Sequence, residues 1–90
     1  MYTLIFPESY KKSEKHFFKK HPDLKEKYFK TLRLLMHDPH HPSLRLHKLR
    51  PPLENFYSVS LNMQYRILID FVIQESEIIL LKIDTHDKAY

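Results

Sequence analysis

The sequence contains no cysteine, no glycine and no tryptophan among its 90 residues. Without cysteine, neither a disulfide framework nor a thiolate zinc site is possible. Without glycine, any turn that needs a positive φ angle must use another residue, and we expect Asn55 and Asn62 to take that role. This absence constrains the turns and carries no information about function.

The sequence also has no apolar run near 18 residues, so no membrane-spanning helix is predicted. Residues 1–6 are followed directly by Pro7 and Glu8 and carry no basic region, which argues against a signal peptide. We therefore expect a cytoplasmic protein.

What the sequence does contain is enough apolar surface for one folded domain over residues 1–90. Hydrophobic residues make up 42% of it and include six Phe and six Tyr, which bury a large area per residue. The net charge is +4 with all histidines counted as neutral, and this favours an anionic partner, either nucleic acid or an acidic protein. Residues 37–50 are rich in His, Lys and Arg and contain Asp38 as their one acid.

The first half of the sequence predicts a short strand followed by a helical hairpin. Residues 2–6 are β-branched and aromatic, as in a strand, and Pro7 begins a helical pattern that runs to Lys20. Asp23 with Glu26 three residues later predicts a capping box for a second helix, which ends before Pro39. The apolar face of that helix consists of Leu24, Tyr28, Leu32 and Leu35.

The second half predicts strands. Residues 44–49 alternate leucine with cations and suggest an exposed strand with a basic face. Residues 56–61, 65–73 and 78–83 read as strands joined by turns, with the odd-numbered residues from Tyr65 to Ile73 facing the core. We predict an α+β fold of order β-α-α-β-β-β, with an N-terminal helical hairpin packed on one side of a mainly antiparallel, twisted sheet.

Strand alternation also indicates a site. Arg66 is predicted to face away from the core, above the small side chains of Ser58 and Ser60, with open space around it. Antiparallel pairing would bring the end of the last strand beside the start of the Arg66 strand, so we expect Arg66 and His86 to be neighbours. The alternatives are a surface ion pair for Arg66, with Asp70 or Glu54, and an ordinary surface position for His86.

Four segments of the sequence resemble the RelE/ParE toxin superfamily, namely residues 46–49, 56–60, 65–69 and 83–90. The spacing from His86 to Tyr90 is similar to the family ending, and the order of elements is similar over nearly the whole chain. Two departures stand out, since Ser58 and Ser60 occupy positions where RelE has lysines, and Asp84 occupies the usual glycine position. A lysine-based mechanism is therefore not available, whereas a histidine-based one is.

The resemblance implies a ribonuclease that cuts messenger RNA on the ribosome without a metal or other cofactor and that is silenced by a cognate antitoxin. It implies that His86 and His47 transfer protons, that Arg66 holds the scissile phosphate, and that Tyr90 stacks on a base or orients the phosphate. Flanking phosphates and ribosomal RNA would be held by Arg45, Lys48 and Arg50. No membrane is implied.

Other interpretations remain open at this point. ParE-type relatives inhibit DNA gyrase, and a third possibility is a binding module without catalytic activity. A metal site at His37, His40 and His41 is disfavoured because no thiolate or carboxylate cluster completes it. An antitoxin segment, often a helix, could lie in a hydrophobic groove or across the basic face, and Leu68, Val72 and Leu80 could line that groove or pack under a loop.

Overall fold

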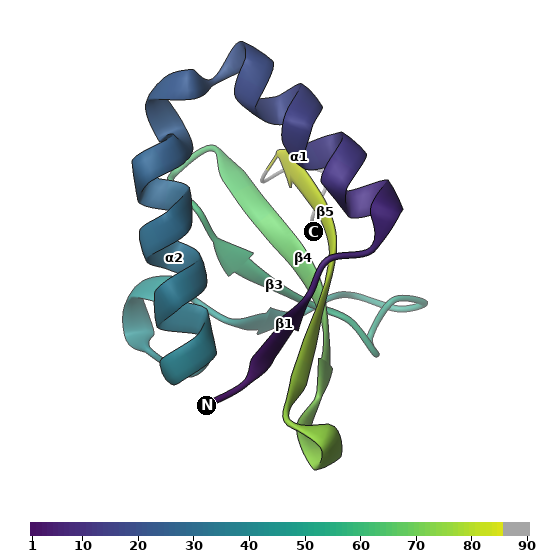
Figure 1. The fold of residues 1–90 in the computed structure, drawn as a ribbon. Helices are drawn as coiled ribbons and strands as arrows, with labels where there is room; N and C mark the ends of the chain where they lie inside the picture. The colour runs from purple at the N-terminus through teal and green to yellow at the C-terminus, as the bar shows by residue number, and fades with distance from the viewer. Residues whose placement is uncertain (86–90) are drawn as a thin grey trace.

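Two helices cover one face of a sheet in the computed structural model, which describes residues 1–85 (Figure 1). The sheet has five strands within this part of the chain, in the order β1-β5-β4-β3-β2. The elements are β1 (Thr3–Ile5), α1 (Glu8–Lys20), α2 (Lys25–His37), β2 (His47–Lys48), β3 (Tyr57–Ser60), β4 (Tyr65–Val72) and β5 (Glu77–Thr85). Short 3-10 helices occupy Pro22–Leu24, Pro42–Leu44 and Ile73–Glu75.

The predicted α+β fold is confirmed, with the helical hairpin on one side of a mainly antiparallel sheet (Figure 1). The β1–β5 pair is parallel, and the other three strand pairs are antiparallel. The order β-α-α-β-β-β omits one strand, because the basic segment 44–49, itself predicted to be an exposed strand, contributes β2 at the edge of the sheet. Only His47 and Lys48 form that strand, since the 3-10 turn before it takes up the chain as far as Leu44.

The hydrophobic core lies between the helices and the sheet. Hydrophobic side chains there are withdrawn from water almost completely, and each contributes about 1.5–3 kcal/mol to the free energy of folding. The residues with no exposed surface are Tyr10, Tyr28, Leu35, Val59, Ile67, Ile69, Ile78 and Leu80. The apolar face predicted for α2 is confirmed at Tyr28, Leu32 and Leu35, all of which are buried.

Two tyrosine hydroxyls form hydrogen bonds inside this core. The hydroxyls of Tyr10 and Tyr28 are 2.8 Å apart, and the Tyr28 hydroxyl donates to the carboxylate of Glu14. Burial raises the pKa of Tyr10 and that of Tyr28 above the usual tyrosine range. Both hydroxyls therefore stay protonated and tie α1 to α2 across the core.

Three local predictions were wrong. The capping box at Asp23 does not form, because residues 22–24 make a 3-10 turn and α2 starts at Lys25 without a side-chain cap. Ile73 is 62% exposed because the chain leaves β4 for a 3-10 turn at that residue. Leu80 belongs to the core instead of the outward groove, because a bulge shifts the register so that Leu80 pairs with Ile69.

The turns of this glycine-free chain also differ from expectation. Positive φ occurs at Arg45 (49°) and Ser76 (53°), and not at Asn55 or Asn62. Asn62 instead accepts hydrogen bonds on its side-chain Oδ1 from the backbone N–H groups of Gln64 and Tyr65. This side chain closes the β3–β4 turn, so a left-handed residue is not needed there.

Candidate functional site

Arg66 lies on the face of the sheet opposite the helices, as strand alternation predicts. It pairs across the sheet with Ser60 on one side and Asp84 on the other, whereas its neighbour Ile67 faces the core. The prediction of open space around Arg66 was wrong, because only 2% of the residue is exposed. Arg66 is thus a buried residue, whereas the alternative interpretation placed it on the surface.

Two neutral acceptors among the described residues form hydrogen bonds with the guanidinium of Arg66. Its Nε donates to the hydroxyl of Ser58 at 3.0 Å, and its Nη2 donates to the backbone carbonyl of Arg45 at 2.8 Å. A buried cation is tolerated only when its N–H groups are hydrogen-bonded, and each such bond to a charged group contributes about 1.5–3 kcal/mol. Ser58, which stands where RelE has a lysine, thus holds the Arg66 guanidinium in position and carries no charge itself.

The carbonyl oxygen of Arg45 links Arg66 to a second predicted site residue. It also contacts Nδ1 of His47 at 2.6 Å. Because a carbonyl only accepts hydrogen bonds, Nδ1 carries the proton, and Nε2 is the basic nitrogen of the neutral ring. His47 is exposed and lies opposite Ser58 in the β2–β3 pair. The structure therefore brings His47 and Arg66 together through one backbone atom.

Arg45 owes this role to its backbone conformation. With φ at 49° it follows the 3-10 turn Pro42–Leu44 in a left-handed conformation. Sequence reasoning identified Arg45 only as a cation, since a positive φ at a non-glycine residue has no sequence signature here. The side chains of Arg45, Lys48 and Arg50 are exposed, in keeping with their predicted contact with an anionic partner.

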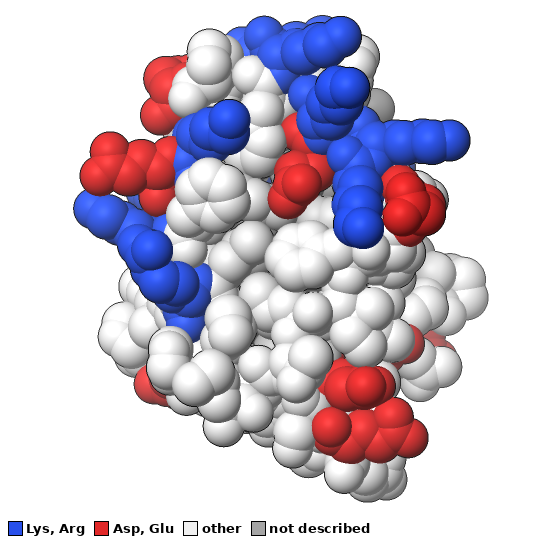
Figure 2. Space-filling view, viewed as in Figure 1, with Lys and Arg blue, Asp and Glu red and all other residues white. Residues whose placement is uncertain are grey.

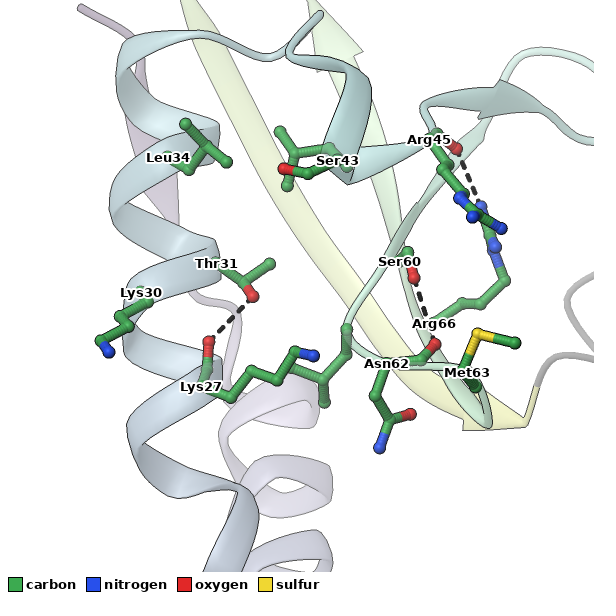
Figure 3. Close-up of a pocket in the computed structure, with 12 residues that line it drawn as sticks. Lys27, Lys30, Thr31, Leu34, Ser43, Arg45, Ser60, Asn62, Met63 and Arg66 are labelled. Atoms are coloured by element: carbon green, nitrogen blue, oxygen red, sulfur yellow. Dashed lines mark hydrogen bonds between the residues drawn. The ribbon is translucent and has the colours of Figure 1, made fainter.

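A cavity of about 410 Å³ borders Arg66 between α2 and the β3–β4 turn (Figure 3). Its walls are residues of α2, of the segment 43–45 and of the turn after β3. The lining residues are Lys27, Lys30, Thr31, Leu34, Ser43, Leu44, Arg45, Ser60, Leu61, Asn62, Met63 and Arg66. Sequence reasoning missed the α2 residues, because a lysine on an exposed helix position looks like ordinary solvated surface.

Lysines and arginines also gather over the two helices, where they alternate with acids and surround a largely uncharged area (Figure 2). The helical face thus carries both signs of charge. The lining of the cavity differs, because it includes cations and no Asp or Glu among the described residues. The charge of the molecule is thus less balanced at the cavity than over the helices.

His86 and Tyr90 lie outside the described residues. The register Arg66↔Asp84 and Tyr65↔Thr85 confirms the antiparallel pairing of β4 with the last described part of β5. Asp84, at the position where the resembling family has glycine, accepts a hydrogen bond from the backbone N–H of Thr85 at 2.8 Å and pairs with Lys82 at 3.1 Å.

Within residues 1–85, no three His, Asp or Glu side chains are grouped closely enough to hold a metal ion. None of the helices in this part of the chain is sufficiently long and apolar to cross a membrane.

Comparison with solved structures reveals the same fold in bacterial toxins. YafQ from E. coli strain BL21(DE3) superposes with a TM-score of 0.78 at 13% identity, over 100% of this chain and 99% of that one. A metal-bound toxin from Helicobacter pylori gives 0.79 at 23% identity over 100% of both chains. The YoeB–YefM complex from Staphylococcus aureus gives 0.72 at 16% identity, over 96% of this chain and 98% of that chain.

No family model matches the sequence, and a search of curated proteins finds no significant relative. The likeness at such low identity shows the fold, so the chain has the fold of the RelE/ParE-type toxins. The resemblance found in the sequence is confirmed at that level.

Proposed function

We propose that this protein is the toxin of a toxin-antitoxin pair and that it cleaves messenger RNA on the ribosome without a metal ion. The fold supports the class of protein, since YafQ and the toxin from H. pylori share it. The observation that carries the chemistry is the Arg45 carbonyl, which accepts hydrogen bonds from both Arg66 and His47. One backbone atom thereby sets the position of a cation relative to a proton-transfer group.

The reaction needs a base, a phosphate-binding cation and an acid. In the proposed mechanism, Nε2 of His47 takes the proton of the 2′-hydroxyl, whose oxygen then attacks the adjacent phosphorus. His86 gives a proton to the departing 5′-oxygen, and Tyr90 stacks on a base. The products are a 2′,3′-cyclic phosphate and a 5′-hydroxyl, so the proton removed by one histidine is balanced by the proton supplied by the other.

Arg66 would stabilise the negative charge that builds up on the phosphorane. Arg66 is largely withdrawn from solvent and is among the residues that border the cavity, so its positive charge would act on a phosphate bound there. A fixed charge in a site of low dielectric acts more strongly than one in water and needs no rearrangement during the reaction. The bonds to Ser58 and Arg45 supply this fixed position.

We also propose a protein antitoxin as partner. The neighbour from S. aureus is a complex of YoeB with YefM, and the net charge of +4 here suits an acidic partner. Leu68 and Val72 are half-buried on the outward side of β4 and would take part in that contact.

The test is cleavage of a ribosome-bound messenger by the purified protein, read by primer extension. His47→Ala should lower the cleavage rate by about 10²–10⁴-fold, as expected for loss of a general base. His37→Ala is the matched control, since His37 is exposed at the end of α2 and should leave the rate unchanged.

Intact messenger after incubation with the wild-type protein would refute the nuclease proposal. Inhibition of DNA supercoiling by gyrase in a parallel assay would then identify a ParE-type activity. Absence of both effects would leave the binding module as the remaining interpretation.

A further inference from the structure

The cavity beside Arg66 has a cationic lining that the cleavage chemistry described above does not use in full. Its volume of about 410 Å³ lies within the range of about 300–1,000 Å³ that small-ligand sites occupy. The cationic side chains in its wall are Lys27, Lys30, Arg45 and Arg66. Of these four residues, Arg66 and the backbone of Arg45 belong to the hydrogen-bond network around His47.

The two lysines of this wall differ in direction. Lys27 extends from α2 across the cavity toward the β3–β4 turn, whereas Lys30 points away from it (Figure 3). The ammonium of Lys30 lies 3.5 Å from the carboxylate of Glu26 on the same helix. Lys27 has no ion-pair partner among residues 1–85, so its charge inside the cavity is not neutralised by an acid of the described chain.

The polar groups around Lys27 are mostly engaged with the protein itself. The hydroxyl of Thr31 donates to the backbone carbonyl of Lys27 at 2.8 Å, and that of Ser60 donates to the carbonyl of Asn62 at 3.1 Å. The hydroxyl of Ser43 contacts Nδ1 of His41 at 2.8 Å. The cations are therefore the groups that would recognise a ligand, and they select an anion.

We infer that this cavity binds a backbone phosphate of the RNA next to the one that is cleaved, with Lys27 as the main cation. The inference rests on the proposed function, since it takes RNA as the substrate. It goes further by adding Lys27 to the substrate-binding residues. Because Arg66 borders the cavity and also bonds the Arg45 carbonyl that His47 contacts, a strand held here is continuous with the cleavage site.

A base contact completes the site. Met63 lies at the β3–β4 turn in the cavity wall and is 86% exposed (Figure 3). An exposed methionine is a flexible, polarisable surface against which a ring can pack. The nucleotide whose phosphate meets Lys27 places its base on Met63.

The experiment measures binding of a short single-stranded RNA with 2′-O-methyl groups, which removes the attacking hydroxyl and prevents cleavage. Fluorescence anisotropy of the labelled RNA gives the Kd for the wild type, Lys27→Ala and Lys30→Ala. Lys27→Ala should weaken binding about fivefold and lower the slope of log K against log salt by about 0.7, as expected for one lost phosphate contact. Lys30→Ala removes the same charge from the same helix and should change Kd less than about twofold.

Two further variants sharpen the result. Lys27→Arg should restore most of the affinity, because it keeps the cation. Met63→Ala should weaken binding without changing the salt slope, because it removes a packing contact and no charge. Equal losses from Lys27→Ala and Lys30→Ala would overturn the inference, since they would reflect net charge alone.

The binding and cleavage assays together distinguish a failure of this inference from a failure of the proposed function. RNA binding that depends on Lys27, together with no cleavage of unmodified messenger, supports the cavity and refutes the nuclease. Cleavage with normal RNA affinity in Lys27→Ala refutes the cavity and leaves the nuclease standing. If Lys27→Ala keeps its RNA affinity but loses affinity for a glutamate-rich peptide, the cavity binds an acidic protein segment and the inference is wrong.

Discussion

Ile67 and Arg66 are neighbours on β4 and are about equally hidden from water, with 0% and 2% of their surface exposed. On the helix side, Ile67 is buried among other hydrophobic residues, and its burial is favourable because apolar surface leaves water. On the opposite side, Arg66 is buried with its charge, and this is possible because Ser58 and Arg45 accept its hydrogen bonds. The first face tolerates hydrophobic side chains of similar volume, whereas the second depends on hydrogen-bond acceptors at particular positions.

Among the substitutions that test this comparison, one on the apolar face should have the largest effect on the free energy of unfolding. Ile67→Ala leaves a cavity at a fully buried position and should lower the free energy of unfolding by about 2–5 kcal/mol, measured by urea denaturation. Ile73→Ala is the control, because Ile73 is 62% exposed and its loss should cost less than about 0.5 kcal/mol. Similar losses in the two variants would mean that residue 73 is packed in the folded protein.

Ser58→Ala tests the polar face. It removes the acceptor of the Arg66 Nε and should lower the free energy of unfolding by about 1–3 kcal/mol, because a charged donor loses its partner. It should also reduce cleavage by the proposed nuclease, since Arg66 would lose part of its fixed orientation. The matched control is Ser60→Ala, which removes a hydroxyl that donates to the carbonyl of Asn62 among the described residues and should cost about 0.5 kcal/mol.

Denaturation at alkaline pH tests the hydrogen-bonded pair Tyr10 and Tyr28, which lies in the hydrophobic core. Burial raises the pKa of Tyr28 and of Tyr10, so the unfolded chain releases protons at lower pH than the folded one. Stability from this source is therefore complete below pH 10, begins to fall as pH rises above the unfolded value of 10.0, and keeps falling until the pH reaches the raised pKa of the folded state. The loss should be about 1.4 kcal/mol per pH unit for each tyrosine.

Tyr28→Phe supplies the control for this titration. It should be less stable at neutral pH, because the bonds to Tyr10 and Glu14 are lost, and its stability should fall less steeply above pH 10. Denaturation curves at a series of pH values measure both slopes. An unchanged slope would show that Tyr28 ionises equally in the folded and unfolded states.

The smallest effect should come from the turn at Ser76, which has a φ of 53°. Ser76→Gly relieves the left-handed conformation and should raise the free energy of unfolding by about 0.5–1 kcal/mol. Ser13→Gly, in the middle of α1, should lower it by about 0.5 kcal/mol, since glycine there only adds backbone freedom to the unfolded chain. A loss in both variants would mean that the turn at Ser76 is not strained.

Much of the fold could be predicted from the sequence. The helical hairpin and the strands on either side of Asn62 follow from apolar spacing, which reflects the local geometry of helix and strand. The errors arose where one element gives way to another. A 3-10 turn replaced the cap expected at Asp23, and a bulge opposite β4 moved Leu80 into the core, both of which depend on packing across the chain.

The candidate site was predictable only in part. Strand alternation predicted the position of Arg66 on the outward face of the sheet, and the resemblance singled out His47 as a proton-transfer group. Neither indicated that the Arg45 carbonyl connects the two, because this bond depends on a left-handed residue in a chain without glycine. The position of Lys27 opposite the β3–β4 turn was equally hidden, since it results from how α2 lies beside the sheet.

The sequence by itself determined which residues from Tyr65 to Val72 face the core and which face outward, because side-chain direction alternates along a regular strand. Only the tertiary structure decided that the outward Arg66 is buried and that Lys27 reaches the same cavity. The physical reason is that a buried charge needs acceptors in particular places. Those acceptors come from Ser58 and Arg45, which lie 8 and 21 residues from Arg66 in sequence.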